Sequence, residues 1–101
     1  MQFFLKARDY RNGGLERREK AIERHWRNCD EMRAGGEFLF GASLLDENNK
    51  MRCSIMVFDF PSRKELDEYL KREPFVVDKV WENYEITPCK VRDVFLKQDR
   101  A

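Results

Sequence analysis

The order in which two hydrophobic periods alternate is the feature that most constrains this chain. Four short segments have the alternation or the β-branched and aromatic content of strands, and two longer segments have the 3.6-residue period of helices. Their order is strand, helix, strand, strand, helix, strand. A chain of 101 residues has room for one such domain. The order predicts a ferredoxin-like α+β fold (βαββαβ), a four-stranded antiparallel sheet with helices on one face.

Turn and capping residues set the expected bounds of these elements. Ser62 and Glu65 form a capping box that starts the second helix, and Pro74 ends it and can open a further helical turn. We expect a domain over residues 1–92 and a charged tail over residues 93–101. The predicted strands are residues 2–8, 37–45, 51–60 and 82–92, and the predicted helices are residues 15–34, those between the Ser62 cap and Pro74, and 75–80.

The first predicted helix carries one narrow apolar stripe on a charged surface. Its Arg- and Lys-rich face is interleaved with Glu, and we interpret that face as solvated. Gly35 and Gly36 follow the helix as a glycine C-cap would. The residues expected in the buried stripe are Leu15, Ile22, Trp26, Cys29 and Met32.

Several predicted strands have apolar side chains on both faces. Phe38 and Phe40 are expected to oppose Leu39, and Ile55 is expected to oppose Met56. Helices can cover only one face of the sheet, so the second apolar face needs another cover. A second copy of the chain, packed sheet against sheet, would supply that cover, and we therefore expect a homodimer.

Composition narrows the classes of function. Charged residues make up 39% of the chain, but 20 basic residues balance 19 acidic ones, without the basic excess of a dedicated nucleic-acid binder. No apolar run is long enough to span a bilayer, and the first residues do not have the pattern of a signal peptide. Three widely spaced cysteines predict no disulfide framework. We expect a cytoplasmic protein that binds neither nucleic acid nor a membrane.

His25 is the only histidine and so the only candidate for imidazole acid–base chemistry. It lies at the border of the apolar stripe, where spacing alone favours a core histidine. Cys29, one turn later, could pair with it as a nucleophile but is more typical of a small core residue. Glu73 before Pro74 suits a helix N-terminus, and it could also hold the His25 ring. No further ligands complete a metal site.

The chain resembles the YciI (YCII-related) family from its first strand to Val91. The family pattern has a helix-one histidine, matched by His25, and an Asp-Pro-aromatic segment, matched by Glu73-Pro74-Phe75 with glutamate in place of aspartate. The resemblance implies a dimeric α/β barrel, a superfamily that includes small cofactor-independent lyases, isomerases and monooxygenases. The other resembling segments are residues 24–26, 36–41, 54–55, 70–76 and 84–88.

Two hypotheses follow for the function. In the first, the protein is a cofactor-independent lyase- or isomerase-type enzyme acting on a small enolisable or aromatic metabolite. His25 is then the acid–base and Glu73 orients it, with Ser43 and Ser54 as candidate polar contacts and neither metal nor cofactor. In the second, the protein is a non-catalytic dimeric barrel that binds a small ligand or assists a pathway enzyme. A His25–Glu73 contact opening to a pocket would favour the enzyme, and an exposed His25 the binding protein.

Overall fold

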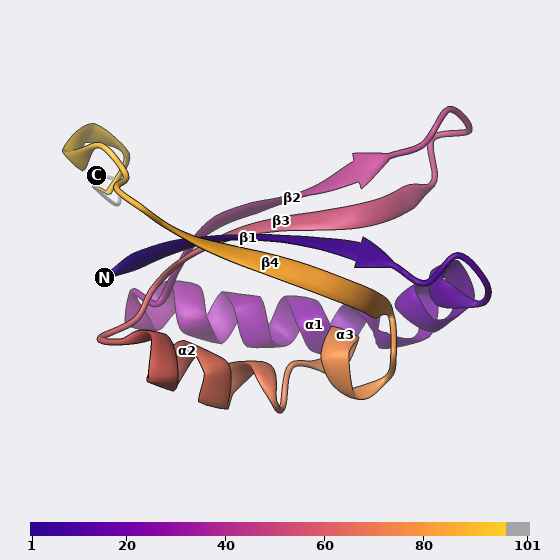
Figure 1. The fold of residues 1–101 in the computed structure, drawn as a ribbon, viewed down its shortest axis with the longest axis horizontal. Coiled ribbons are helices and arrows are strands. Elements are labelled where there is room, and N and C mark those ends of the chain that lie inside the picture. Colours follow the sequence, from indigo (N-terminus) through magenta and orange to yellow (C-terminus); the bar gives the residue numbers. More distant parts are fainter. Residues whose placement is uncertain (97–101) are drawn as a thin grey trace.

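The computed structural model describes residues 1–96 and has the predicted order of strands and helices (Figure 1). The three α-helices lie on one face of the four-stranded sheet, and within residues 1–96 only a short 3-10 turn lies toward the other side. The predicted ferredoxin-like α+β architecture is therefore confirmed. The strands are β1 (Gln2–Asp9), β2 (Phe38–Leu45), β3 (Met51–Asp59) and β4 (Trp81–Cys89), and the helices are α1 (Gly14–Gly35), α2 (Arg63–Leu70), α3 (Pro74–Val77) and the 3-10 turn η1 (Asp93–Phe95).

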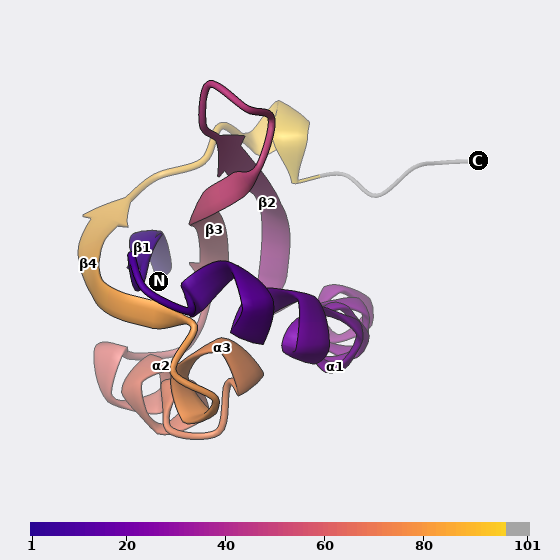
Figure 2. The ribbon, with the colours of Figure 1, turned by 90° about the vertical axis from the view of Figure 1, so that its right-hand side faces the viewer.

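The sheet is antiparallel with the order β2-β3-β1-β4. Viewed from its end, α1 lies beneath the β2–β3 side, and α2 and α3 lie beneath the β4 side (Figure 2). β2 and β4 are thus the edge strands. Pro88 lies on β4, as expected of a residue that cannot donate to a central ladder.

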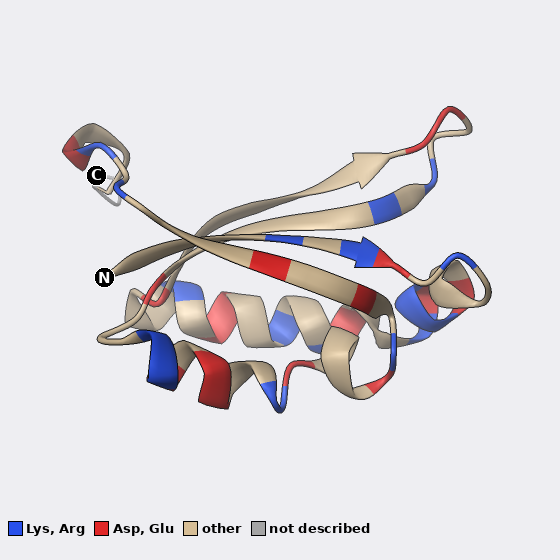
Figure 3. Ribbon diagram, viewed as in Figure 1, with Lys and Arg blue, Asp and Glu red and all other residues tan. Residues whose placement is uncertain are grey.

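The core lies between the sheet and the helices. Alternate side chains of β1, Phe3, Leu5 and Ala7, are completely or almost completely buried on this helix-side face. They pack with Leu66 and Leu70 of α2 in one continuous apolar cluster. Both α1 and α2 carry acidic and basic residues, whereas β2 has none of either (Figure 3). Charge is therefore distributed over the helices without a single-sign patch.

The predicted stripe of α1 is only partly correct. Cys29 and Met32 are buried, but Trp26 is 54% exposed, and Leu15 and Ile22 are only half-buried. The reason is that polar residues with internal partners occupy the helix face that packs on the sheet, so apolar spacing alone misjudged the rotation of the helix. That buried face consists of Gly14, Arg18, Ala21, His25, Cys29 and Met32.

Glycine ends α1 as predicted. Gly36 has φ 88°, in the left-handed region that glycine adopts without strain, and its N–H reaches the carbonyl of Arg33. The chain then turns directly into β2, so α1 and β2 lie side by side.

A β-bulge in β2 contradicts the expected orientation of its first residues. Phe38 pairs with Phe58, whereas Phe40 pairs with the next residue, Val57, so Leu39 is the extra residue. Phe38 and Phe40 therefore face opposite sides of the sheet and do not share a face. The freed carbonyl of Leu39 accepts a hydrogen bond from Arg33 Nη1 at 2.9 Å.

Two capping residues start the short helices. The Ser62 hydroxyl accepts the Glu65 backbone N–H at 3.2 Å, which is half of the predicted capping box. The second helix ends at Leu70, before Pro74 as predicted, and the residue before this proline is held extended. That residue, Glu73, is instead the N-cap of α3.

None of the helices within residues 1–96 is long and apolar enough to cross a membrane. Of the tail predicted over residues 93–101, the first residues form η1, and residues 97–101 lie outside the described part of the chain. Val94 and Phe95 of this turn are exposed.

Candidate active site

Glu73 and His25 meet inside the protein, as the sequence predicted. Glu73 is fully buried, and its two carboxylate oxygens lie 2.9 and 3.0 Å from His25 Nδ1. The same carboxylate accepts the Tyr69 hydroxyl at 2.7 Å and the Phe75 backbone N–H at 2.7 Å. Three polar groups therefore converge on this one buried carboxylate.

Local sequence explains why the carboxylate lies there. Pro74 occupies the first turn of α3, where its missing N–H is not needed, and it keeps Glu73 extended. The Glu73 side chain can then turn back on the Phe75 N–H as an N-cap. Because α3 packs against α1, this cap faces His25.

Aromatic rings fix the plane of the imidazole. The Phe75 ring stacks on the His25 ring with centroids 4.0 Å apart and an angle of 10° between the planes. The Trp81 ring approaches the imidazole edge-on at 6.3 Å. With the ring held in this plane, Nδ1 faces Glu73 and Nε2 faces the other way.

The donors around Glu73 determine which imidazole nitrogen carries the proton. The carboxylate can only accept from Nδ1, so in the neutral tautomer Nδ1 carries the hydrogen and Nε2 carries the lone pair. Burial and the charge of Glu73 raise the pKa of the Tyr69 hydroxyl well above its ordinary value, which keeps it a donor. His25 therefore has the arrangement of a general base oriented by a carboxylate.

Cys29 lies next to this base but is not a thiolate. Its Sγ is 3.6 Å from His25 Nε2. Burial, followed by the charges of Glu73 and Asp30, raises the pKa of the Cys29 thiol from 9.0 to about 12. The neutral thiol is a poor nucleophile, which argues against the alternative of cysteine-based catalysis.

A cavity of about 340 Å³ opens beside the His25 ring, between α1 and the β2–β3 pair. Of the predicted site residues, His25, Ser43 and Ser54 line this His25 cavity, and Glu73 lies behind the imidazole, outside the lining. Ser43 and Ser54 pair directly across the two strands. The remaining lining residues are Trp26, Cys29, Asp30, Phe38, Gly41, Ala42, Ile55 and Met56.

Gly41 has no side chain, which leaves the β2 side of the cavity open. A Cβ at this position would lie 2.9 Å from both the Ile55 carbonyl oxygen and the Phe38 ring, which is closer than real Cβ contacts. Any larger residue would therefore have to displace the Phe38 ring or the backbone of β3.

Sequence analysis missed a second buried polar cluster. Arg18 is 2% exposed, and its Nε and Nη2 donate to the two carboxylate oxygens of Asp9 at 2.7 and 2.9 Å. Arg18 Nη2 and Trp81 Nε1 also donate to Ser54 Oγ, at 2.8 and 3.1 Å. We had interpreted Arg18 as part of a solvated face. Arg18 lies two helical turns before His25, which places both on one side of the helix, and this spacing was the available sign that Arg18 is buried.

The Arg18 cluster and the cluster of His25, Glu73 and Tyr69 (the His25 cluster) are in contact through Phe75. The Arg18 guanidinium lies over the Phe75 ring, 4.8 Å from its centroid, on the ring that also stacks on His25. Ser54 belongs to the Arg18 cluster and also lines the His25 cavity. The hydrogen-bond network of Arg18 and that of His25 therefore both border the His25 cavity.

Two solved structures share this fold at 17% identity each. One is 5-chloro-2-hydroxyhydroquinone dehydrochlorinase (TftG) from Burkholderia phenoliruptrix AC1100 in complex with 2,5-dihydroxybenzoquinone, with a TM-score of 0.78 over 89% of this chain and 94% of that chain. The other is protein Atu4242 from Agrobacterium tumefaciens, with a TM-score of 0.51 over 92% of this chain and 95% of that chain. No curated protein matches the chain. The model of the YCII-related domain matches residues 1–90, and the chain therefore belongs to the YCII-related family.

Proposed function

We propose that this protein is a cofactor-independent enzyme that carries out lyase- or isomerase-type acid–base chemistry on a small metabolite in the His25 cavity. One observation carries the proposal: a buried carboxylate holds His25 Nδ1, and the same imidazole lines a cavity. A histidine that served only the core would not need to border an open space.

The proposed reaction begins with proton transfer to Nε2. The substrate C–H or O–H bond breaks, the N–H bond forms, and Glu73 stabilises the resulting imidazolium. The electron pair left on the substrate then either expels a leaving group from the neighbouring carbon or takes a proton back at another carbon. The first outcome is a lyase reaction and the second is an isomerisation.

Ser54 is suited to stabilise the oxygen on which negative charge develops. Its Oγ already accepts hydrogen bonds from Arg18 and Trp81, so its own O–H remains to be donated. Within residues 1–96 that hydrogen has no acceptor, and Ser54 lines the cavity. We assign it the role of a donor to a substrate carbonyl or enolate oxygen, with Ser43 as a second contact across the strand pair.

The shape of the cavity favours a small, flat, oxygenated substrate. Trp26, Phe38 and Met56 provide apolar walls, while the two serines provide hydroxyl groups. The ligand of the structurally similar TftG, 2,5-dihydroxybenzoquinone, has this character, and that enzyme is a dehydrochlorinase. These features support a ring or enol compound as the substrate class.

Two variants test the proposal, with a third as a control. We expect His25→Asn and Glu73→Gln to lose proton exchange from a panel of small enolisable carbonyl compounds in D2O, measured by NMR, while exposed Glu68→Gln keeps it. Folding is checked by circular dichroism, because both variants disturb a buried hydrogen bond. Binding of 2,5-dihydroxybenzoquinone, followed by its absorbance, without any exchange in the parent protein would instead favour the non-catalytic ligand-binding alternative.

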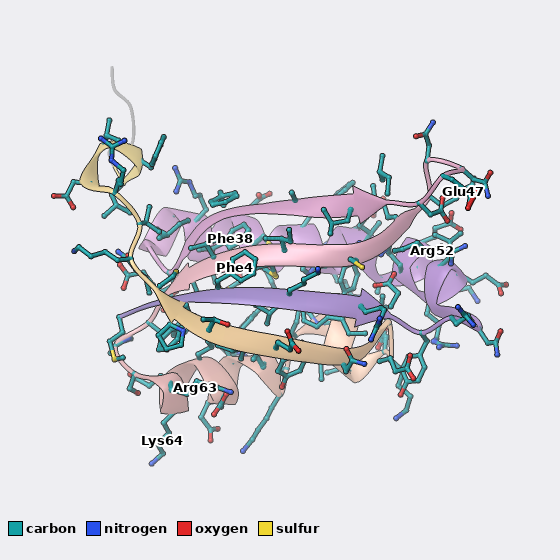
Figure 4. The ribbon with its side chains drawn as sticks, turned by 45° about the horizontal axis from the view of Figure 1, so that its top comes forward. Phe4, Phe38, Glu47, Arg52, Arg63 and Lys64 are labelled. Atoms are coloured by element: carbon teal, nitrogen blue, oxygen red, sulfur yellow. The ribbon has the colours of Figure 1, made fainter. Side chains whose placement is uncertain are left out.

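We also propose that the protein is a homodimer that packs through its open sheet face. Phe4 lies on that face (Figure 4), and the strand register places Ile55 and Leu44 there as well. Phe40 on the same face is 55% exposed. A stable interface of this kind should bury more than about 1,000 Å². Sedimentation should give a dimer at micromolar concentration and a monomer for Phe40→Glu, and a monomeric parent protein would refute the proposal.

A further inference from the structure

The imidazole of His25 and the thiol of Cys29, both on α1, are in contact at the His25 cavity. The proposed reaction gives this contact no role. His25 Nε2 and Cys29 Sγ are 3.6 Å apart, both residues are 7% exposed, and both line the cavity. Within residues 1–96, Cys29 is the only hydrogen-bond partner of this nitrogen. The nitrogen that should receive the substrate proton therefore already has a partner.

The direction of this hydrogen bond follows from the geometry on the other side of the ring. Nδ1 donates to Glu73, so in the neutral imidazole Nε2 can only accept. The donor must then be the Cys29 S–H. The thiol remains protonated because burial and two nearby carboxylates raise its pKa to about 12.

We propose that Cys29 is a positioning residue whose S–H occupies the lone pair of His25 Nε2 in the resting protein, and that the substrate displaces it. This inference rests on the proposed function, because it describes access to the same base. A thiol is a weak donor, so an incoming O–H group can replace it at small cost. After proton transfer the sulfur can rotate its hydrogen away and accept weakly from Nε2–H.

A thiol suits this role better than a serine hydroxyl or an alanine methyl group. A serine hydroxyl is a stronger donor than a thiol and would compete more effectively with the substrate for the lone pair. An alanine would leave the nitrogen to water. A cysteine that only filled space would show neither difference, since alanine would then cost packing alone.

The contact is tested first without any ligand. His25 is the only histidine, so its two imidazole nitrogens give unambiguous signals in ¹⁵N NMR. We expect Cys29→Ser and Cys29→Ala to shift the Nε2 signal much more than the Nδ1 signal. Cys53→Ala, on the open sheet face, should shift neither. An unchanged Nε2 signal in both Cys29 variants would overturn the inference.

The second measurement is the affinity for hydroquinone, a neutral ring whose O–H can donate to Nε2, by calorimetric titration. We expect Cys29→Ser to raise Kd at least about threefold over the parent protein and Cys29→Ala not to raise it. Equal Kd values for the parent and Cys29→Ser would count against displacement. The two proposals fail separately: the NMR result decides the contact even in a catalytically silent protein, and lost turnover in His25→Asn with an unmoved Nε2 signal would refute only the role of Cys29.

Discussion

Two buried polar clusters lie on the helix side of the sheet, and they differ in what they can exchange with a ligand. In the Arg18 cluster, a guanidinium and the Asp9 carboxylate satisfy each other through two hydrogen bonds, and the charges cancel. In the His25 cluster, a carboxylate holds one side of an imidazole that also lines a cavity. Both clusters are buried. The comparison teaches that burial alone does not single out a candidate site, because of the two pairs only His25–Glu73 includes an imidazole, and that imidazole lines the cavity.

The largest effect should come from breaking the Arg18 cluster. Asp9→Ala removes both carboxylate acceptors and leaves Arg18 buried without its counter-charge, which we expect to cost about 3–5 kcal/mol in the free energy of unfolding. Urea denaturation at fixed protein concentration measures this. The partly exposed Asp59→Ala, which removes a pair with the N-terminal amine, should cost less than about 1 kcal/mol. A similar small loss for Asp9→Ala would show that the Arg18 cluster is not a structural element.

A smaller loss of stability is expected in the His25 cluster. Glu73→Gln keeps the shape of the side chain but places an amide among three donors, and we expect a cost of about 1–3 kcal/mol. The proposed proton exchange should disappear in the same variant. If exchange instead persisted in a folded Glu73→Gln protein, the contrast between the two clusters would lose its functional meaning.

The N-cap of α2 is a single hydrogen bond outside both clusters, and the stability lost on removing it gives a scale for the losses expected in the clusters. Ser62→Ala should reduce the free energy of unfolding by about 1 kcal/mol, because the Glu65 N–H loses its acceptor. Ser62→Asp should retain most of the stability. Ser43→Ala, at an exposed strand position without such a cap, provides the matched comparison and should change stability by less than about 0.5 kcal/mol.

The last effect, the alkaline response of Cys29, makes no contribution at neutral pH. The folded thiol has its pKa raised from 9.0 to about 12, so above pH 9 the unfolded chain loses this proton before the folded protein does. Stability should therefore fall as the pH rises from about 9 toward 12, and less steeply in Cys29→Ala. Denaturation at a series of alkaline pH values checks this, with Cys53→Ala as the control. Identical slopes for the parent and Cys29→Ala would contradict the raised pKa.

The parts of the site that sequence could predict depended on local rules. Pro74 restricts the residue before it and tolerates a helix start, so Glu73 was correctly placed at the start of a helical turn. Its contact with the only histidine of the chain, 48 residues earlier, was one of two roles considered for it, beside that of a plain helix cap. The order of periods likewise predicted the sheet and its covering helices.

The parts that sequence could not predict depended on tertiary partners. The helical position of Arg18 was a weak signal, because a buried guanidinium is expected only where a counter-charge such as Asp9, from a different element, faces it. Trp26 looked like core because it has helical spacing to other apolar residues, yet it lies at the cavity with half its surface exposed. The orientation of Phe40 depended on a bulge that no turn residue announces.

The bulge at Leu39 decides how much empty space the protein contains. Because one residue of β2 is skipped in the pairing with β3, Gly41 and Ser43 face α1 and Phe40 and Leu44 face away. Regular pairing of the same residues from Phe38 onward would reverse every one of them. Two large side chains would then project toward His25 and fill the space that a substrate needs. The cavity beside His25 therefore depends on the one-residue register shift in β2. The same amino acids paired without that shift would fill the cavity with side chains.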